Sequence, residues 1–191
     1  ALMYETLTNG IFLEVGGTST DISCVKDGKV MVKYAEVGGH KTYLTSLDVR
    51  TVGIGGGSMI QIENGKISDV GPRSVHIAGL DYEVYSDSAD IVDPVLCAIK
   101  PTDTDPDYAY VQCSNGKKFA LSLAGAANLA GYVKDEDYAK GNVEAARKAW
   151  KPLADNMGMS VEEAAKEALR LSAVKNGKVV KALIEDYNMD P

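Results

Sequence analysis

Three strand-like segments separated by glycine-containing turns occupy residues 10–37, and they constrain the fold more than any other feature of the chain. Gly10 to Val15 is a short apolar run, Asp21 to Lys26 alternates between apolar and polar residues, and Lys29 to Val37 is rich in Val and Tyr. Asp27-Gly28 is a dipeptide that favours a two-residue hairpin turn. These segments predict three antiparallel strands, with a Gly-Gly loop between the first two.

Two more hairpins are predicted further along the chain. The first covers residues 59–72, turns at Asn64-Gly65 and ends at Gly71-Pro72. The second covers residues 108–121 and turns at Ser114-Asn115-Gly116. From Ala124 onwards the apolar residues instead recur with the period of a helix.

The helical segment has recognisable start and stop signals. A helix is predicted from Val143 to Met157, where Gly158 is placed to end it. The next helix begins at Ser160, which forms a capping box with Glu163. Asn176-Gly177 predicts a kink or a break before the last helical stretch. The predicted fold class is therefore α/β, with antiparallel β-hairpins followed by C-terminal helices.

The chain divides by composition into three parts within about one domain. Residues 1–80 are rich in strands and contain the Gly-Gly loop, and residues 108–191 hold the last hairpin and the helices. Between them, residues 81–107 carry eight carboxylates against one lysine, together with three prolines. This composition predicts an acidic surface excursion. It could bind a cation, but the carboxylates lack EF-hand spacing, which favours a solvated loop.

Charge and composition exclude several classes of function. With 27 acidic and 20 basic residues among 191, the chain has a formal charge of −7 and lacks the basic patches that bind nucleic acid or anionic membranes. No apolar run reaches the roughly 18 residues of a membrane span. Three cysteines lie far apart without a CxxC pair, which fits a reducing cytoplasm and disfavours a disulfide framework or a zinc site.

The loop from Gly16 to Thr20 has the composition of an anion-binding turn. Two adjacent glycines allow positive φ, so that backbone N–H groups can converge on one anion, and three hydroxyls add donors beside them. Asp21 follows directly, where a carboxylate can hold Mg²⁺ or orient a water molecule. An ordinary β-turn explains the same residues, because Gly-Gly turns are common. The residues alone leave both interpretations open.

Other candidate groups are less specific. Walker A fails because no Gly-Lys pair is followed by Ser or Thr, and the GxGxxG fingerprint fails because Ser58 stands where the third glycine should be. The cluster Gly55 to Gly57 could supply backbone amides or hinge freedom, or it could let two segments pack closely. His40, His76 and Arg73 are possible ligand contacts, but solvated or structural roles are the simpler explanation. The cysteines predicted on strands are expected to be small buried residues rather than nucleophiles.

Three motifs carry a family resemblance when they are taken together. EVGGTSTD at Glu14 to Asp21 is followed by LDVRTVGIGGGS at Leu47 to Ser58 and by VGPRS at Val70 to Ser74. This combination resembles the A-type subunit of the hydantoinase/oxoprolinase family, which includes acetone-carboxylase-like relatives. The segment from Ala124 to Pro191 is also similar to that family, so the resemblance covers nearly the whole chain.

The resemblance implies half of an actin-like ATPase fold, related to ribonuclease H, in which paired glycine-rich hairpins hold the ATP phosphates from opposite sides. This chain matches the second half. Asp21 is then expected to be catalytic and to bind Mg²⁺, and Glu14 is expected to be catalytic. The expected ATP contacts are Gly16, Gly17, Thr18, Ser19, Thr20, Gly55, Gly56 and Gly57.

The activity implied by the resemblance is ATP-dependent opening of a cyclic amide, such as a hydantoin or 5-oxoproline, or carboxylation of a ketone. Members often work with a B-type partner subunit. The family's other phosphate loop and a further glycine-rich loop lie outside these residues, so this segment alone is expected to be inactive and to bind nucleotide weakly.

One departure and two alternatives accompany the resemblance. The family motif usually begins with Asp where this chain has Glu14, which moves the carboxylate by about 1.5 Å and alters how it could position a metal or a water. A regulatory or assembly ATP-binding module of actin-like fold, without small-metabolite turnover, is one alternative. A sugar-kinase-like transferase is the other.

Overall fold

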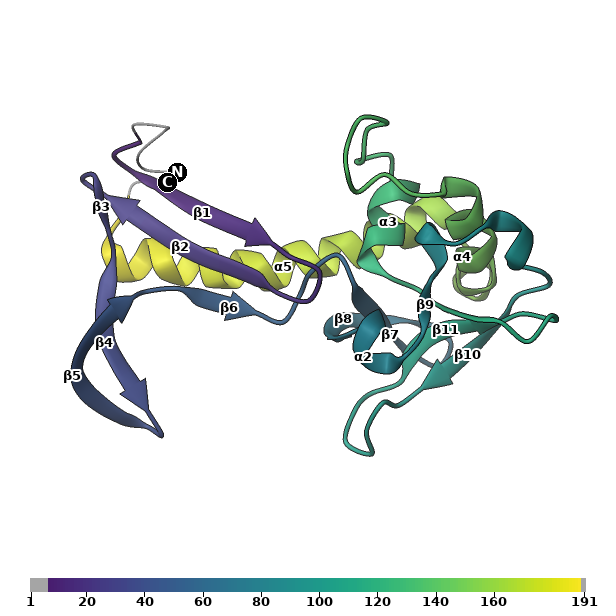
Figure 1. Cartoon of the computed structure of the whole chain (residues 1–191), viewed down its shortest axis with the longest axis horizontal. Helices are drawn as coiled ribbons and strands as arrows, with labels where there is room; N and C mark the ends of the chain where they lie inside the picture. Colours follow the sequence, from purple (N-terminus) through teal and green to yellow (C-terminus); the bar gives the residue numbers. More distant parts are fainter. Residues whose placement is uncertain (1–6, 190–191) are drawn as a thin grey trace.

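The computed structural model describes residues 7–189, without the side chains of Glu36, Val37 and Lys41. The described chain forms two lobes joined by a single long helix, α5 (Val161–Tyr187), which runs along both of them (Figure 1). We call residues 10–52 the N-terminal lobe and residues 58–157 the C-terminal lobe. This arrangement of antiparallel hairpins followed by helices confirms the predicted α/β class.

The N-terminal lobe is a four-stranded antiparallel sheet with a separate hairpin beside it. Asp27 and Gly28 have φ values of 51° and 71°, as a tight hairpin turn of this kind requires. On one face of the sheet, Ile22 and Cys24 are buried against α5. The sheet contains β1 (Gly10–Val15), β2 (Thr20–Lys26), β3 (Lys29–Val30) and β6 (Arg50–Val52), and the hairpin contains β4 (Val32–Val37) and β5 (His40–Leu47).

The C-terminal lobe contains a six-stranded sheet. Asn64 and Gly65 form the predicted turn between its first two strands, both with positive φ. The hairpin was predicted to end at Gly71-Pro72, and this is wrong, because the second strand continues through these residues to Ser74. The strands are β7 (Ser58–Glu63), β8 (Lys66–Ser74), β9 (Asp81–Tyr82), β10 (Val95–Ile99), β11 (Tyr108–Gln112) and β12 (Lys118–Ala120).

Residues 81–107 are only partly a surface excursion. They include β9, two short 3-10 helices, η1 (Glu83–Tyr85) and η2 (Ser88–Asp90), and the sheet strand β10. Val84 and Ile91 belong to the main hydrophobic cluster, and the Glu83 side chain is completely buried. The acidic composition concealed these few inward-pointing residues, which build the segment into the lobe.

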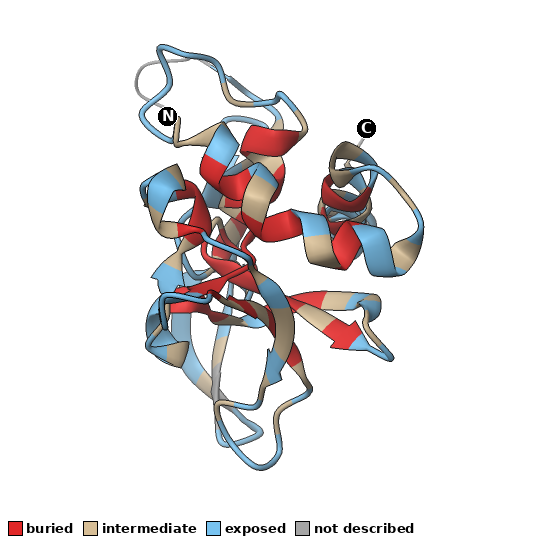
Figure 2. Ribbon diagram, turned by 90° about the vertical axis from the view of Figure 1, so that its right-hand side faces the viewer, coloured by how far each residue is buried: buried red, intermediate tan, exposed pale blue. Residues whose placement is uncertain are grey.

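The helices cover the sheet of the C-terminal lobe and begin and end at the predicted signals. Ser160 and Glu163 form the capping box of α5, and Gly158 ends the preceding helix with a φ of 67°. Buried residues gather where helices and strands face one another (Figure 2), and Trp150 is the largest of them. None of the helices in the described part of the chain is long and apolar enough to cross a bilayer. The shorter helices are α2 (Val75–Ala78), α3 (Leu123–Leu129) and α4 (Val143–Met157).

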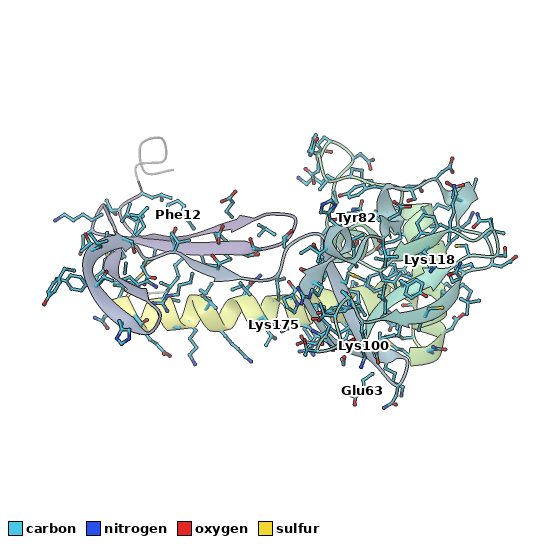
Figure 3. The ribbon with its side chains drawn as sticks, turned by 60° about the horizontal axis from the view of Figure 1, so that its bottom comes forward. Phe12, Glu63, Tyr82, Lys100, Lys118 and Lys175 are labelled. Atoms are coloured by element: carbon cyan, nitrogen blue, oxygen red, sulfur yellow. The ribbon has the colours of Figure 1, made fainter. Side chains whose placement is uncertain are left out.

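The α5 helix runs without a break through Asn176-Gly177, so the predicted interruption there is wrong. Its N-terminal half packs into the main core of the C-terminal lobe, while Leu183 packs against the N-terminal sheet. Between these halves Lys175, labelled in Figure 3, contacts the Asp69 carboxylate at 2.5 Å and the Val70 carbonyl at 2.9 Å. Packing at both ends outweighs the low helix propensity of Asn and Gly.

Replacing Gly177 with alanine should therefore stabilise the protein. Gly177 is exposed, and a Cβ at this position meets no atom within 4 Å. We expect the free energy of unfolding, measured in urea, to rise by about 1 kcal/mol, because alanine costs less conformational entropy in a helix. The contrasting variant is Gly158→Ala, which should destabilise the protein because the backbone of Gly158 has a left-handed conformation that alanine adopts only with strain. A loss of stability in Gly177→Ala would contradict an unstrained, continuous helix.

Candidate functional site

The loop between β1 and β2 is a tight turn whose tip presents free donors. Its base is closed by the Gly16 amide, which donates to the Ser19 carbonyl at 2.9 Å. Within residues 7–189, the amides of Gly17, Thr18 and Ser19 donate no hydrogen bond. Gly17 and Thr18 are exposed and Ser19 is half-buried. The tip therefore offers three amides and two hydroxyls to an anion.

The second glycine cluster lies directly behind this loop and holds it in place. The Gly56 amide donates to the Gly16 carbonyl at 2.9 Å, and the Gly57 amide donates to the Gly17 carbonyl at 2.6 Å. The Gly55 amide is also occupied, since it donates to Ser58 Oγ at 2.9 Å. All three amides are therefore used within the protein, which favours the close-packing role for this cluster over a role as amide donors to a ligand.

Close approach explains why these positions are glycine. A Cβ on Gly55 would lie 2.4 Å from the Gly16 carbonyl oxygen. A Cβ on Gly57 would lie 2.2 Å from the hydroxyl oxygen of Tyr82, which is labelled in Figure 3. Thr20 completes the attachment, because its buried hydroxyl donates to the Ile54 carbonyl at 2.6 Å. The Thr20 hydroxyl thus stabilises the base of the loop, whereas the hydroxyls of Thr18 and Ser19 lie at its tip.

A cavity of about 390 Å³ opens between the base of this loop, α3 and the middle of α5. Its size lies within the range of about 300–1000 Å³ that is typical of small-molecule sites. Most of the wall is apolar, and the expected contacts Gly16, Thr20, Gly55 and Gly56 belong to it. The other lining residues are Val15, Ile54, Tyr85, Leu123, Ala124, Ala127, Asn128, Val133, Ala139, Leu169, Ser172 and Asn176.

The two candidate carboxylates, Glu14 and Asp21, lie beside each other on the face of the N-terminal sheet that does not contact α5. Glu14 and Asp21 are directly paired across β1 and β2, and Asp21 is paired with Thr51 of β6. The Thr51 hydroxyl donates to Asp21 Oδ1 at 2.5 Å. Because side chains alternate along a strand, this row faces away from α5 and from the cavity. The structure thus brings Glu14 and Asp21 together next to the loop, but outside the cavity.

This pair suits a metal that brings its own oxygen ligands. Among the side chains described in residues 7–189, no three His, Cys, Asp or Glu residues gather closely enough to hold a metal ion by themselves. Mg²⁺ is usually bound by one or two carboxylates together with phosphate oxygens and water. Asp21 and Glu14 therefore fit Mg²⁺ bound with a polyphosphate.

The remaining candidates have structural surroundings. Arg73 pairs with Asp105 at 2.9 Å, which makes it part of a surface ion pair. His40 and His76 are exposed. Cys24 and Cys113 are buried, and desolvation raises the pKa of each thiol, which agrees with a packing role.

Glu83 is a buried ionisable residue that the sequence did not single out. Its carboxylate accepts hydrogen bonds from the Ser122 amide at 2.9 Å, the Ser122 hydroxyl at 3.1 Å and Trp150 Nε1 at 3.0 Å. Desolvation raises the pKa of Glu83 to about 7, although these donors oppose the shift. Glu83 thus joins η1, the start of α3 and α4. No local sequence pattern signals this, because its partners lie 39 and 67 residues away.

Asp48 is a second buried carboxylate, only 2% exposed, in the N-terminal lobe. Arg50, Lys33 and Tyr187 all contact it, at distances between 2.8 and 3.0 Å. Burial raises its pKa, but these three partners outweigh burial and lower the pKa to about 2. This network ties the end of α5 to the N-terminal lobe.

Comparisons with known proteins found one family model and a solved structure that match this chain. The family model described as hydantoinase/oxoprolinase matches residues 1–191. The nucleotide-free structure of acetone carboxylase, from a study of ATP-dependent acetone carboxylation, matches with a TM-score of 0.59 and 18% identity. The match covers 94% of this chain and 22% of the acetone carboxylase chain. No curated protein sequence matches the chain.

The structural match shows a fold shared with part of acetone carboxylase, consistent with half of an actin-like fold. The family match extends over all three motifs, from the β1–β2 loop to the end of β8, and over the helices. The chain belongs to the hydantoinase/oxoprolinase family.

Proposed function

We propose that this chain binds the phosphates of ATP within an ATP-dependent enzyme of the hydantoinase, oxoprolinase or acetone carboxylase type. The observation that carries the proposal is the β1–β2 loop, whose tip has free amides while its base is fixed by residues 54–57. Donors that are already ordered bind an anion without the entropy cost of ordering a flexible loop. The family and the shared fold support ATP as the polyanion.

In this proposal, the loop tip holds phosphate oxygens through the amides of Gly17, Thr18 and Ser19 and through the two hydroxyls. Asp21 and Glu14 hold Mg²⁺, which would neutralise phosphate charge when bound. Thr51 keeps the Asp21 carboxylate in one orientation through its hydrogen bond. The cavity on the other face of the sheet receives the nucleoside.

The whole reaction is proposed to open a cyclic amide, such as a hydantoin or 5-oxoproline, or to carboxylate a ketone. The chain spans 22% of the acetone carboxylase chain that it matches. We therefore propose that other parts of a complete cytoplasmic enzyme, together with a B-type partner subunit, supply the opposing phosphate loop and the substrate site.

The direct test is ATP turnover by the complete protein with its partner subunit. ADP release should be compared without substrate, with hydantoins, with 5-oxoproline, and with acetone plus bicarbonate. We expect one of these substrates to accelerate ADP release. If ATP is hydrolysed but none of them accelerates it, the protein is a regulatory or assembly module instead.

A pair of variants tests whether ATP turnover depends on the carboxylate of Asp21. Asp21→Asn should lower substrate-stimulated ADP release by about 100-fold, because an amide is a weak Mg²⁺ ligand. Ser23→Ala is the control, since Ser23 lies two residues further along β2 on the same face. Equal activity of Asp21→Asn and Ser23→Ala would remove Asp21 from the proposed site.

A further inference from the structure

One polar atom in the cavity wall stands out because no group in the described part of the chain satisfies it. Asn176 Oδ1 is buried and has no hydrogen-bond partner within the described residues. Buried side-chain oxygens are nearly always bonded, and an exception calls for an explanation such as a ligand. Asn is also a weak helix former, yet this one lies in the interior of α5. Helix propensity therefore does not account for Asn176, and its Oδ1 leaves a hydrogen bond unmade.

Three other polar side chains of the wall, those of Asn128, Thr20 and Tyr85, are already engaged. The Asn128 amide donates to the carbonyls of Ala124 and Ala139 and accepts from the Gly141 amide. The Thr20 hydroxyl donates to Ile54, as described above. The Tyr85 hydroxyl donates to the Ala139 carbonyl at 3.3 Å. These groups hold the wall together, whereas Asn176 lines the cavity with an acceptor that no described group satisfies.

The position of Asn176 on α5 directs it into the cavity. Leu169, Ser172 and Asn176 are spaced by three and four residues, so they form one stripe on the helix, and all three line the cavity. Leu123 and Ala127 of α3 also belong to the apolar wall. A ligand here meets apolar side chains on its faces and the Asn176 amide at one edge.

The ligand chemistry follows from these surroundings and from the loop. Gly16 and Thr20 belong both to the cavity wall and to the base of the β1–β2 loop, so the cavity adjoins the loop whose tip is the proposed phosphate site. A flat heteroaromatic ring suits apolar walls. A side-chain amide pairs with adenine in two hydrogen bonds, to the exocyclic amino group and the adjacent ring nitrogen. Guanine presents a carbonyl oxygen where adenine has its amino group.

We infer that Asn176 reads the adenine base of the nucleotide and makes this site prefer ATP over GTP. This inference rests on the proposed function and adds a specificity-determining residue to it. It also gives a role to Asn176, a weak helix former in the interior of α5.

The test compares binding of ATP, GTP and base-free tripolyphosphate to the complete protein by calorimetry. The variants are Asn176→Leu, which keeps the size of the side chain but removes its polar atoms, and Asn176→Ala. We expect both variants to lower the affinity for ATP by about 10-fold or more and to leave the affinity for tripolyphosphate unchanged. Both should also abolish the preference for ATP over GTP. Gly177→Ala is the control and should leave that preference intact, because the new methyl group lies in open space.

Two results would overturn the inference and leave the phosphate site standing. One is an unchanged ATP to GTP ratio in both Asn176 variants while ATP still binds. The other is an equal loss of ATP and tripolyphosphate affinity, which would make Asn176 a structural residue. If none of the three compounds binds to the unmodified protein, the proposed function fails, and this inference fails with it.

Discussion

Gly55→Ala is expected to displace the β1–β2 loop and to lower both stability and ATP affinity. The new Cβ would lie 2.4 Å from the Gly16 carbonyl oxygen, 2.7 Å from the Gly17 carbonyl carbon and 2.8 Å from the Thr18 amide nitrogen. These are backbone atoms, so no side chain can rotate away to make room. We expect the free energy of unfolding to fall by about 2–3 kcal/mol in urea denaturation, and ATP affinity to fall more than about 10-fold.

Gly17→Ala provides the matched control within the same loop. A Cβ on Gly17 meets no atom within 4 Å, and Gly17 is not among the residues with positive φ. Its free energy of unfolding should therefore stay within about 0.5 kcal/mol of the unmodified protein. If Gly55→Ala were as stable as Gly17→Ala, the two glycine segments would not be packed together as described.

Glu83→Gln is expected to remove a large part of the pH dependence of stability. Burial raises the pKa of Glu83 from its ordinary value of 4.5 to about 7 in the folded protein. Between these values the folded state holds a proton that the unfolded state has lost, so stability is greatest below pH 4.5 and falls as the pH rises to 7. A shift of this size corresponds to about 3 kcal/mol. Glutamine carries no charge at any of these pH values, and its carbonyl can still accept from Trp150.

The measurement is the free energy of unfolding in urea at pH 5 and at pH 8. We expect the difference between the two pH values to shrink by about 2–3 kcal/mol in Glu83→Gln. Glu144→Gln, at an exposed position of α4, should keep the difference unchanged. Asp48 does not interfere, because its lowered pKa of about 2 affects stability only as the pH falls below 3.8. An undiminished difference in Glu83→Gln would mean that Glu83 is ionised in the folded protein at pH 5.

The parts of the fold that the sequence predicted correctly are those set by neighbouring residues. The turns at Asp27-Gly28 and Asn64-Gly65 need positive φ at both positions, and this requirement is local. The capping box at Ser160 and Glu163 likewise depends on residues three apart. The glycine-rich composition of the β1–β2 loop also indicated a candidate anion site, which stays a prediction; the loop tip has three amides that donate no hydrogen bond within residues 7–189.

The features that the sequence did not predict depend on contacts between distant segments. Asn176-Gly177 is a local break signal, but α5 packs on both lobes and stays helical. Glu83 reads as one more acidic surface residue until Trp150 and Ser122 enclose it. Gly55 is close to Gly16 only in the folded chain, so its role as a support could not be distinguished from a role as a donor. In each case tertiary packing decides the outcome.

The uninterrupted α5 helix has a mechanical consequence for the cavity. A helix of 27 residues is about 40 Å long and stiff along its axis. The two halves of the helix belong to hydrophobic clusters in different lobes, so the helix fixes the distance between the two lobes (Figure 1). The cavity lies against the middle of this helix, so the helix fixes one of its walls, while the base of the β1–β2 loop and α3 form the others.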